Sequence, residues 1–352
     1  MHSPLSVKKH GVILEPRGEG FEAKAVLNPA CYQEGDTVHM LYRAVDKKGH
    51  SSIGYARLEG PQKVVERWEK PLIARRYRYE SDGVEDPRVA KIGDTFYLTY
   101  VATDGRNAIS AYASGKDIFH LRKRGIISPR FTYHTAVKIF EKSYPKARLK
   151  DAYFFFASFY EEENGKNVLV WHKDFILFPK KIRGKFVALQ RILPDIQILS
   201  FRSFQELKQR AFWRKNFANI PRHVVLENKH WFESRNIGGG CPPVWTPDGW
   251  VIIYHGVEAL NKKRVYHASA ALLDKDNPAK VIGKLHEPLF SPVQTWEKRG
   301  MVANVVFPTG TALFGDRLYI YYGAADKRIA VASVSLRALI REMKHPTYRH
   351  HA

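Results

Sequence analysis

One type of segment recurs five times along the chain: a glycine-containing turn that runs directly into aromatic and β-branched residues. The copies are EGDTVHMLYRAV, IGDTFYLTYVAT, IRGKFVALQRI, PDGWVIIYHGV and FGDRLYIYYGAA, which begin at Glu34, Ile92, Ile182, Pro247 and Phe314. Glycine adopts the backbone conformations that tight hairpin turns need, and runs of β-branched and aromatic residues favour strands. Each copy therefore predicts a hairpin turn that feeds a strand.

The spacing of these turns predicts the architecture. They lie near residues 36, 94, 184, 249 and 316, so the intervals are 58, 90, 65 and 67 residues. The longest interval contains an insertion near residues 131–171, where we expect a further hairpin around the turn ENGKN. Five β-rich units at this spacing predict an all-β, five-bladed β-propeller, and an irregular β-sandwich is the alternative. We expect one domain over residues 1–352, with its core at about 21–334.

Helical patterns are scarce in the sequence. The segment SFQELKQRAFW, near Phe204, has helical periodicity, and SLRALIREMK predicts a short C-terminal helix.

No apolar run reaches the roughly 18 residues of a membrane span, and the first residues lack the apolar core of a signal peptide. The two cysteines, Cys31 and Cys241, form neither a disulfide framework nor a metal pattern. These observations predict a cytoplasmic protein without a membrane anchor.

The charge of the chain is strongly positive, with 57 basic and 35 acidic residues and a net charge of +22. Such a charge favours anionic partners, which include nucleic acid, phosphates and acidic surfaces. A solvated basic face is the alternative interpretation, since binding a phosphate group needs only two or three cations.

The motif VEDPR places two carboxylates, Glu85 and Asp86, directly before Pro87 and Arg88. Proline disfavours the helical region for the preceding residue, so we expect Asp86 to be extended and the two carboxylates to point to opposite sides. One could then face a central channel with a raised pKa and donate a proton. The alternative is a turn with a structural Asp–Arg pair.

Other polar motifs argue against a P-loop, a zinc-protease site and a serine nucleophile. The segment IGGGCPP lacks the Lys-Ser/Thr of a P-loop, so its glycines are expected to allow close approach of a ligand or a neighbouring strand. The histidines His255, His267 and His286 do not have zinc-protease spacing, and His255 could equally be a core residue. No G-x-S-x-G elbow is present. We therefore expect no metal and no serine nucleophile.

The motifs taken together resemble those of glycoside hydrolase family 130, the β-mannoside phosphorylases and their hydrolase relatives. The matching segments run from Phe21 to about Val334 and include FEAKAVLNPA, LYRAVD, GVEDPRV, TDGRN, RILPDIQI, IGGGCPP, GWVIIYHGVE and YIYYGAAD. The resemblance implies a five-bladed propeller that performs inverting phosphorolysis of β-1,2- or β-1,4-linked mannosides. The products would be α-mannose 1-phosphate and a shortened acceptor, with inorganic phosphate as co-substrate and no cofactor.

The resemblance also implies residue roles. Asp86 would be the general acid, which acts through a sugar hydroxyl. The implied mannosyl-binding residues are Asn28, Arg43 and Asp326. The implied phosphate-binding residues are Lys173, Arg191, Arg235, Asn236 and His255. The chain departs from the family pattern at Asp174, where Asn is common, at Gln190, where His is common, and at Asn236, where Lys is common.

Two further functions are considered. An inverting β-mannosidase on the same scaffold would need a second carboxylate to activate water, for which Glu258 is a candidate. A non-enzymatic basic propeller could bind nucleic acid or acidic glycans, but it leaves the joint presence of these motifs unexplained. The expected partners are therefore a mannose-containing oligosaccharide and phosphate rather than nucleic acid or a membrane. A homo-oligomer is compatible with the family, although the chain has no coiled-coil heptads.

Overall fold

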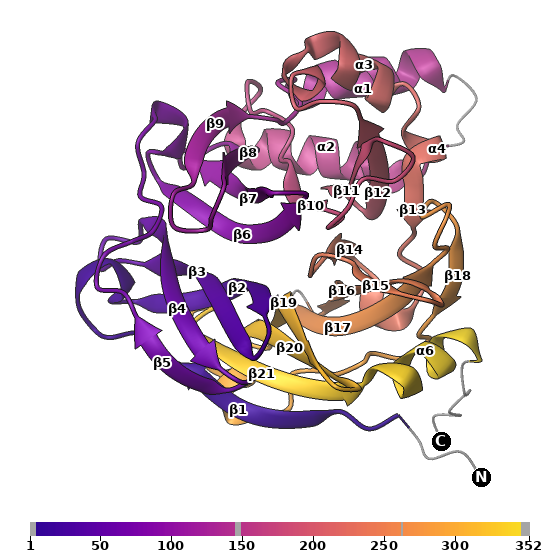
Figure 1. Cartoon of the computed structure of the whole chain (residues 1–352). Helices are drawn as coiled ribbons and strands as arrows, with labels where there is room; N and C mark the ends of the chain where they lie inside the picture. Colours follow the sequence, from indigo (N-terminus) through magenta and orange to yellow (C-terminus); the bar gives the residue numbers. More distant parts are fainter. Residues whose placement is uncertain (1–4, 145–148, 262, 346–352) are drawn as a thin grey trace.

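The structure is a computed structural model that describes residues 5–144, 149–261 and 263–345. It is built mainly from antiparallel strands, with a few helices at the periphery (Figure 1). The prediction of an all-β fold is therefore confirmed at the level of fold class. No helix in the described ranges is long and apolar enough to cross a membrane.

The first two groups of strands share one sheet. Its strands are β2 (Ala25–Glu34), β3 (Thr37–Val45), β4 (Ser51–Glu59), β5 (Lys63–Arg67), β6 (Gly83–Ile92), β7 (Thr95–Thr103), β8 (Ala108–Gly115) and β9 (Arg122–Ile126). Strands β2 to β5 form one antiparallel group and β6 to β9 form another. A single parallel pair, Ser51 with Gly83, joins the two groups.

Three further sheets complete the β-structure. The first contains β10 (Lys173–Leu177), β11 (Phe186–Ile192), β12 (Asp195–Phe201) and β13 (Val224–Leu226). The second contains β14 (Asn236–Gly239), β15 (Val244–Thr246), β16 (Gly249–Leu260), β17 (Lys263–Leu273) and β18 (Val281–Lys284). The third contains β19 (Val306–Phe314), β20 (Arg317–Ala324), β21 (Arg328–Ser335) and β1 (Lys8–Leu14). The first strand of the chain thus completes the last sheet.

All five predicted turns join antiparallel strands. They connect β2 to β3, β6 to β7, β10 to β11, β15 to β16 and β19 to β20. Gly35, Gly93 and Gly315 have φ angles of 59°, 60° and 57°, a region that glycine adopts without steric cost. The first strand of each group, which we call the leading strand (β2, β6, β10, β14 or β19), lies toward the middle of the molecule (Figure 1). The hairpin predictions are therefore confirmed.

The insertion near residues 131–171 differs from the prediction. It forms two helices, α1 (Tyr133–Ser143) and α2 (Asp151–Asn164), instead of a hairpin, and residues 145–148 between them lie outside the described residues. The aromatic run in α2 has high strand propensity, but propensity yields to packing. Tyr153, Phe156 and Ala157 are the buried residues of α2, and their i, i+3, i+4 spacing matches one face of a helix.

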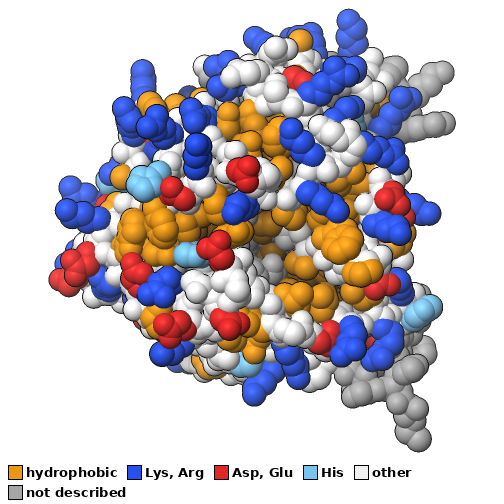
Figure 2. Space-filling model, viewed as in Figure 1, with side chains coloured by type: hydrophobic (Ala, Val, Ile, Leu, Met, Phe, Trp, Pro, Cys, Tyr) orange, Lys and Arg blue, Asp and Glu red, His pale blue; other side chains and the backbone are white. Residues whose placement is uncertain are grey.

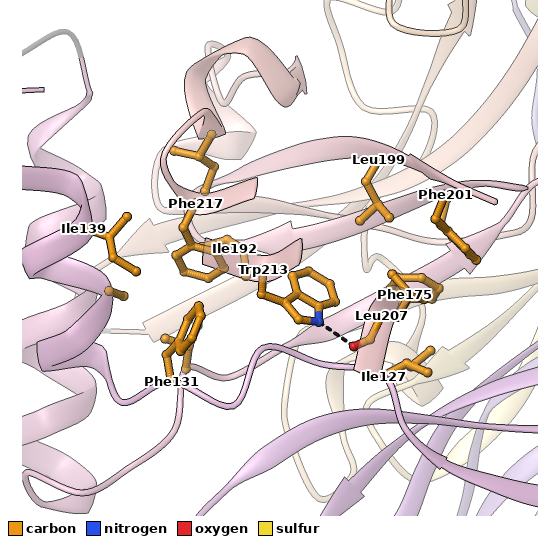
Figure 3. Close-up of a cluster of buried hydrophobic side chains, with 14 of the residues drawn as sticks. Ile127, Phe131, Ile139, Phe175, Ile192, Leu199, Phe201, Leu207, Trp213 and Phe217 are labelled. Carbon is orange, nitrogen blue, oxygen red and sulfur yellow. Dashed lines mark hydrogen bonds between the residues drawn. The ribbon is translucent and has the colours of Figure 1, made fainter. Parts of the chain in front are cut away.

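The remaining helices agree better with the sequence. Near Phe204 lie η3 (Glu206–Lys208) and α3 (Arg210–Phe217), and α6 (Leu336–Lys344) follows the last strand. Two short helices, α4 (Ile220–His223) and α5 (Thr295–Lys298), were not predicted. Side chains from α1, α3 and the third group of strands form one hydrophobic cluster (Figure 3). At its centre the buried indole of Trp213 donates a 2.7 Å hydrogen bond to the carbonyl of Leu207 (Figure 3).

A buried acid recurs just before four of the leading strands. These acids are Glu22 in η1 (Gly20–Glu22), Glu80 in η2 (Arg78–Glu80), Glu233 in η4 (Trp231–Glu233) and Glu297 in α5. Each accepts a hydrogen bond of 2.6–2.8 Å from a tyrosine on the next long strand, respectively Tyr42, Tyr100, Tyr254 and Tyr322. Each also pairs with a cation on the outermost strand, respectively Arg67, Lys123, Lys284 and Lys9. Because a buried carboxylate needs such partners, this repeated contact ties the outer edge of each group to its inner edge.

Candidate active site

Three leading strands carry the same backbone irregularity at their inner end. The pairing of β2 with β3, β6 with β7 and β10 with β11 is interrupted by a bulge. Each bulge contains a residue in the left-handed region: Asn28 (φ 49°), Asp86 (φ 48°) or Asp174 (φ 52°). Asn and Asp tolerate this conformation better than other residues that carry a side chain, and bulges redirect side chains beside active sites. The expectation that Asp86 is extended is wrong, because the bulge determines its conformation.

The bulge on β6 also overturns the expectation that Glu85 and Asp86 point to opposite sides. Both carboxylates contact Arg43, with 2.5 Å from its Nη2 to Glu85 Oε1 and 3.6 Å from its Nη1 to Asp86 Oδ1. The Arg43 Nε donates to Ser51 Oγ at 3.0 Å, which fixes the guanidinium plane. Asn28 Nδ2 donates to Asp86 Oδ1 at 2.7 Å. The structure thus brings three predicted residues, Asn28, Arg43 and Asp86, into direct contact.

The electrostatics of Asp86 differ from the expectation of a raised pKa. Burial alone would raise its pKa, but the positive charges of Arg43, Lys173 and Arg88 and the hydrogen bond from Asn28 outweigh it. The pKa of Asp86 is therefore held below its ordinary range. In the absence of substrate, Asp86 is a carboxylate at neutral pH.

Asp326 behaves in the opposite way. It lies in the turn between β20 and β21 with a left-handed φ of 50°. Burial and the negative charges of Asp86 and Glu85 raise its pKa to about 6, against the opposing charges of Arg43 and Lys173. The predicted sugar-binding acid thus belongs to the same electrostatic centre, and it holds its proton more strongly than Asp86 does.

A second cluster lies beside the first and is centred on Asp174. Its carboxylate is 3.1 Å from Arg191 Nη1 and 3.8 Å from Arg88 Nη2. Arg191 Nη1 is also 3.4 Å from Nε2 of His255, which is fully buried. Burial, together with the charges of Arg191 and Arg88, holds the pKa of His255 well below its ordinary value. His255 is therefore neutral and can accept a hydrogen bond from Arg191.

The glycine run of β14 allows this cluster to form. A Cβ atom on Gly238 would lie 2.5 Å from Asp174 Oδ2 and 2.5 Å from His255 Nε2. Since real Cβ atoms do not approach other atoms so closely, only glycine fits between these two side chains. The carbonyl of Gly240 accepts a hydrogen bond from Arg88 Nε. The run IGGG thus serves the close packing of neighbouring strands.

The family profile described as beta-1,4-mannooligosaccharide phosphorylase, glycoside hydrolase family 130, matches residues 17–345. The chain belongs to glycoside hydrolase family 130. A 1,2-beta-oligomannan phosphorylase of Thermoanaerobacter sp. (strain X514) is 31% identical over 92% of this chain and 95% of its own length. A beta-1,2-mannobiose phosphorylase of the same organism is 32% identical over 92% of this chain and 94% of its own. The beta-1,2-mannobiose phosphorylase structure from Listeria innocua shares the fold, with a TM-score of 0.71 over 96% of this chain and 99% of that chain, at 23% identity.

The other predicted phosphate residues of this family 130 protein lie around the second cluster. Lys173 precedes Asp174, and its ammonium group lies 5.1 Å from the centre of the Trp171 ring. Arg235 donates a 2.6 Å hydrogen bond to Asn236 Oδ1, and its guanidinium lies 5.0 Å from the Phe156 ring of α2. The insertion therefore contributes an aromatic contact to a predicted site residue.

The surface of the molecule is hollowed near the middle of the face shown in Figure 2, with hydrophobic and basic side chains around the hollow.

Two members of the second cluster were not assigned a role at the site from the sequence. Arg88 was expected only to balance nearby carboxylates, but it reaches Asp174 from a different group of strands, and only the fold shows this. Asp174 was visible as a departure from the family pattern. Gln190, a second departure, is buried and hydrogen-bonded at 2.9 Å to His172. In the described residues no group of His, Cys, Asp and Glu is suited to hold a metal ion.

Proposed function

We propose that this protein catalyses the inverting phosphorolysis of β-mannosides, with β-1,2-linked manno-oligosaccharides as its substrates. The observation that carries this proposal is the match, over more than nine-tenths of the chain, to two relatives named as β-1,2-mannoside phosphorylases. The buried cations beside Asp86 agree with it, since guanidinium groups suit a phosphate anion. A relative named as a β-1,4-mannooligosaccharide phosphorylase is 36% identical but aligns over 54% of this chain, so the β-1,2 linkage is proposed from the greater coverage of the other two relatives.

In this proposal Asp86 is the general acid. An oxygen of phosphate attacks the anomeric carbon of the terminal mannosyl residue while the bond from that carbon to the glycosidic oxygen breaks. The proton of Asp86 passes through a sugar hydroxyl to the departing oxygen, and inversion gives α-mannose 1-phosphate. One protein carboxylate is sufficient, because phosphate replaces the base-activated water of an inverting glycosidase.

The lowered pKa of Asp86 in the substrate-free centre is compatible with this role. Arg43, Lys173 and Arg88 hold Asp86 ionised as long as no phosphate is bound. A phosphate anion that binds near Lys173 and Arg88 adds negative charge, which raises the pKa of a neighbouring carboxyl. Phosphate binding would thereby help Asp86 to take up the proton that it must donate.

The first cluster is proposed to hold the mannosyl residue. Asn28, Arg43 and Asp326 offer amide, guanidinium and carboxyl groups, which form directional hydrogen bonds with sugar hydroxyls. The contact from Asn28 to Asp86 would orient the acid, and Arg43 would fix it through its ion pair. We further propose that the five groups of strands are the blades of a five-bladed β-propeller that forms one catalytic domain. The closeness of β2 to both β6 and β19 supports this arrangement.

Hydrolysis on the same scaffold is the second candidate. It is favoured by the presence of a second acid, Asp174, beside the centre, where a phosphorylase would be expected to keep only cations. Glu258, the base considered from the sequence, is 3.2 Å from Nε2 of His267. An inverting hydrolase would use one such carboxylate to activate water.

A product assay separates the two reactions. Purified protein is incubated with β-1,2- and β-1,4-linked manno-oligosaccharides, with and without inorganic phosphate, and mannose 1-phosphate and free mannose are both quantified. Phosphorolysis predicts mannose 1-phosphate only when phosphate is present, and more from the β-1,2 substrates. Equal release of free mannose in both conditions would refute phosphorolysis. The Asp86→Asn variant is the control and should give neither product.

A further inference from the structure

The second cluster contains an acid where an anion is expected to bind. Arg88, Arg191 and Lys173 supply positive charge to this side of the centre, and Asp174 lies among them with its side chain only 1% exposed. Burial raises the pKa of Asp174 even though Arg191 and Arg88 oppose the rise. A buried carboxylate at this position therefore competes with any external anion for the same two guanidinium groups.

The contacts around Asp174 are loose. Arg191 Nη1 lies within ion-pair distance of Asp174 Oδ2, yet this oxygen has no hydrogen-bond partner in the described structure. Arg88 Nη2 is likewise buried without a hydrogen-bond partner there, and it is 3.8 Å from the other oxygen. A purely structural ion pair would be expected to satisfy these groups with well-aligned hydrogen bonds. Both guanidinium groups are thus partly neutralised, and Arg88 still has a free donor at Nη2.

We propose that Asp174 is a specificity-determining residue that sets the phosphate affinity of this enzyme by partly neutralising Arg88 and Arg191. The inference rests on the proposed phosphorolysis and assigns Asp174 an effect exerted through the two arginines. Partial neutralisation of the two arginines would weaken binding of the product as well as of phosphate. The sugar phosphate formed carries the same anionic group, so a site that holds phosphate less tightly also releases its product more readily.

The test compares Asp174→Asn with the wild type. Asparagine keeps the shape of the side chain and tolerates the left-handed φ of 52°, but it removes the charge. Binding of inorganic phosphate, and of sulfate as an anion that cannot react, is measured by titration calorimetry and by the rise in Tm on adding each anion. We expect Asp174→Asn to bind both anions about tenfold or more tightly, because removal of one charge a few ångströms away changes the interaction by at least that factor.

A matched control is available in the same group of strands. Asp195 is also a buried acid, and its carboxylate is 3.0 Å from Nζ of Lys150. Neither residue has been placed in the centre. Asp195→Asn should leave anion affinity unchanged. If Asp174→Asn fails to fold, Asp174→Gly provides the same loss of charge with a residue suited to a positive φ. In a working enzyme the KM for phosphate and the KM for mannose 1-phosphate should both fall, while the KM for the oligosaccharide stays the same.

The outcomes are distinguishable. Tighter anion binding in the Asp174 variant, with no change in the Asp195 control, supports the proposal. This result does not depend on whether a β-mannoside is cleaved, so the product assay tests the proposed function separately. Unchanged or weaker anion binding would overturn the proposal and leave Asp174 as a structural partner of the arginines. Equal tightening in the Asp195 control would also overturn it. Loss of phosphate-independent mannose release in Asp174→Asn would instead identify Asp174 as a water-activating base.

Discussion

Because folding raises the pKa of Asp326, its ionised side chain lowers the stability of the folded protein. Asp326→Asn should remove this destabilisation. The pKa rises from an ordinary 3.8 to about 6 on folding. Each pKa unit corresponds to 1.36 kcal/mol, so the ionised side chain destabilises the fold by about 3 kcal/mol above pH 6. Because Asp326 is only partly buried, solvent screening reduces the expected value to about 2 kcal/mol.

The sign of the pH dependence follows from proton binding. The folded state holds a proton on Asp326 between pH 3.8 and about 6, where the unfolded chain has released it, so wild-type stability falls as pH rises through this window. Asparagine cannot ionise and tolerates the left-handed backbone of this turn. The variant should therefore match the wild type near pH 4 and exceed its stability by about 2 kcal/mol above pH 7.

Guanidinium denaturation of both proteins at pH 4.5, 5.5, 6.5 and 7.5 measures this difference. A stability difference that does not change with pH would refute the reasoning, because it would show that Asp326 carries no folding-linked proton. The variant should also bind β-mannosides more weakly, since it loses a proposed hydrogen-bonding carboxylate. A gain in stability together with a loss of activity is common where functional sites concentrate like charges.

Three other predictions concern the centre and its support. Asp86→Asn should lower kcat by about 10²–10⁴-fold, as expected for a general acid, with an unchanged circular dichroism spectrum. Gly238→Ala should destabilise the protein by about 1–3 kcal/mol in thermal unfolding, because its Cβ would lie 2.5 Å from Asp174 Oδ2. Tyr254→Phe removes a 2.6 Å hydrogen bond to the buried carboxylate of Glu233 and should cost about 1–3 kcal/mol, with little change in KM. A fully stable Gly238→Ala protein would contradict the packing described for β14.

The turns were predictable because a tight hairpin needs a specific residue at a specific place. Gly35 and Gly315 each supply the positive φ that their turn requires, so the five strand pairs could be found from the sequence. The insertion was not predictable from residue preference. The aromatic residues of α2 favour a strand on their own, and the helical spacing of Tyr153, Phe156 and Ala157 competes with that preference until the rest of the fold is in place.

Several residues of the predicted site lie together in the fold, but their geometry was not predictable from the sequence. Pro87 suggested an extended Asp86, yet the bulge on β6 places it in the left-handed region, where both Glu85 and Asp86 reach Arg43. A bulge depends on the pairing of two strands, which a local motif does not encode.

One sequence signal was present and missed. A glutamate that follows an aromatic residue lies six residues before Asn28 and again six residues before Asp86, in the pairs Phe21-Glu22 and Tyr79-Glu80. These glutamates are the buried acids before β2 and β6. The two copies therefore mark equivalent backbone positions, and a comparison of the repeated units with one another would have aligned Asn28 with Asp86.

The left-handed positions at Asn28, Asp86 and Asp174 have a consequence for how this scaffold can evolve. Asparagine and aspartate have nearly the same shape, both accept this backbone, and their codons differ by one base. A single mutation can therefore change the charge of the centre at any of the three positions without moving a strand. These three positions of the leading strands thus accept an amide or an acid without a change of backbone. Each exchange alters the hydrogen bonds, as the contact from Asn28 to Asp86 shows, and changes the charge of the centre one substitution at a time.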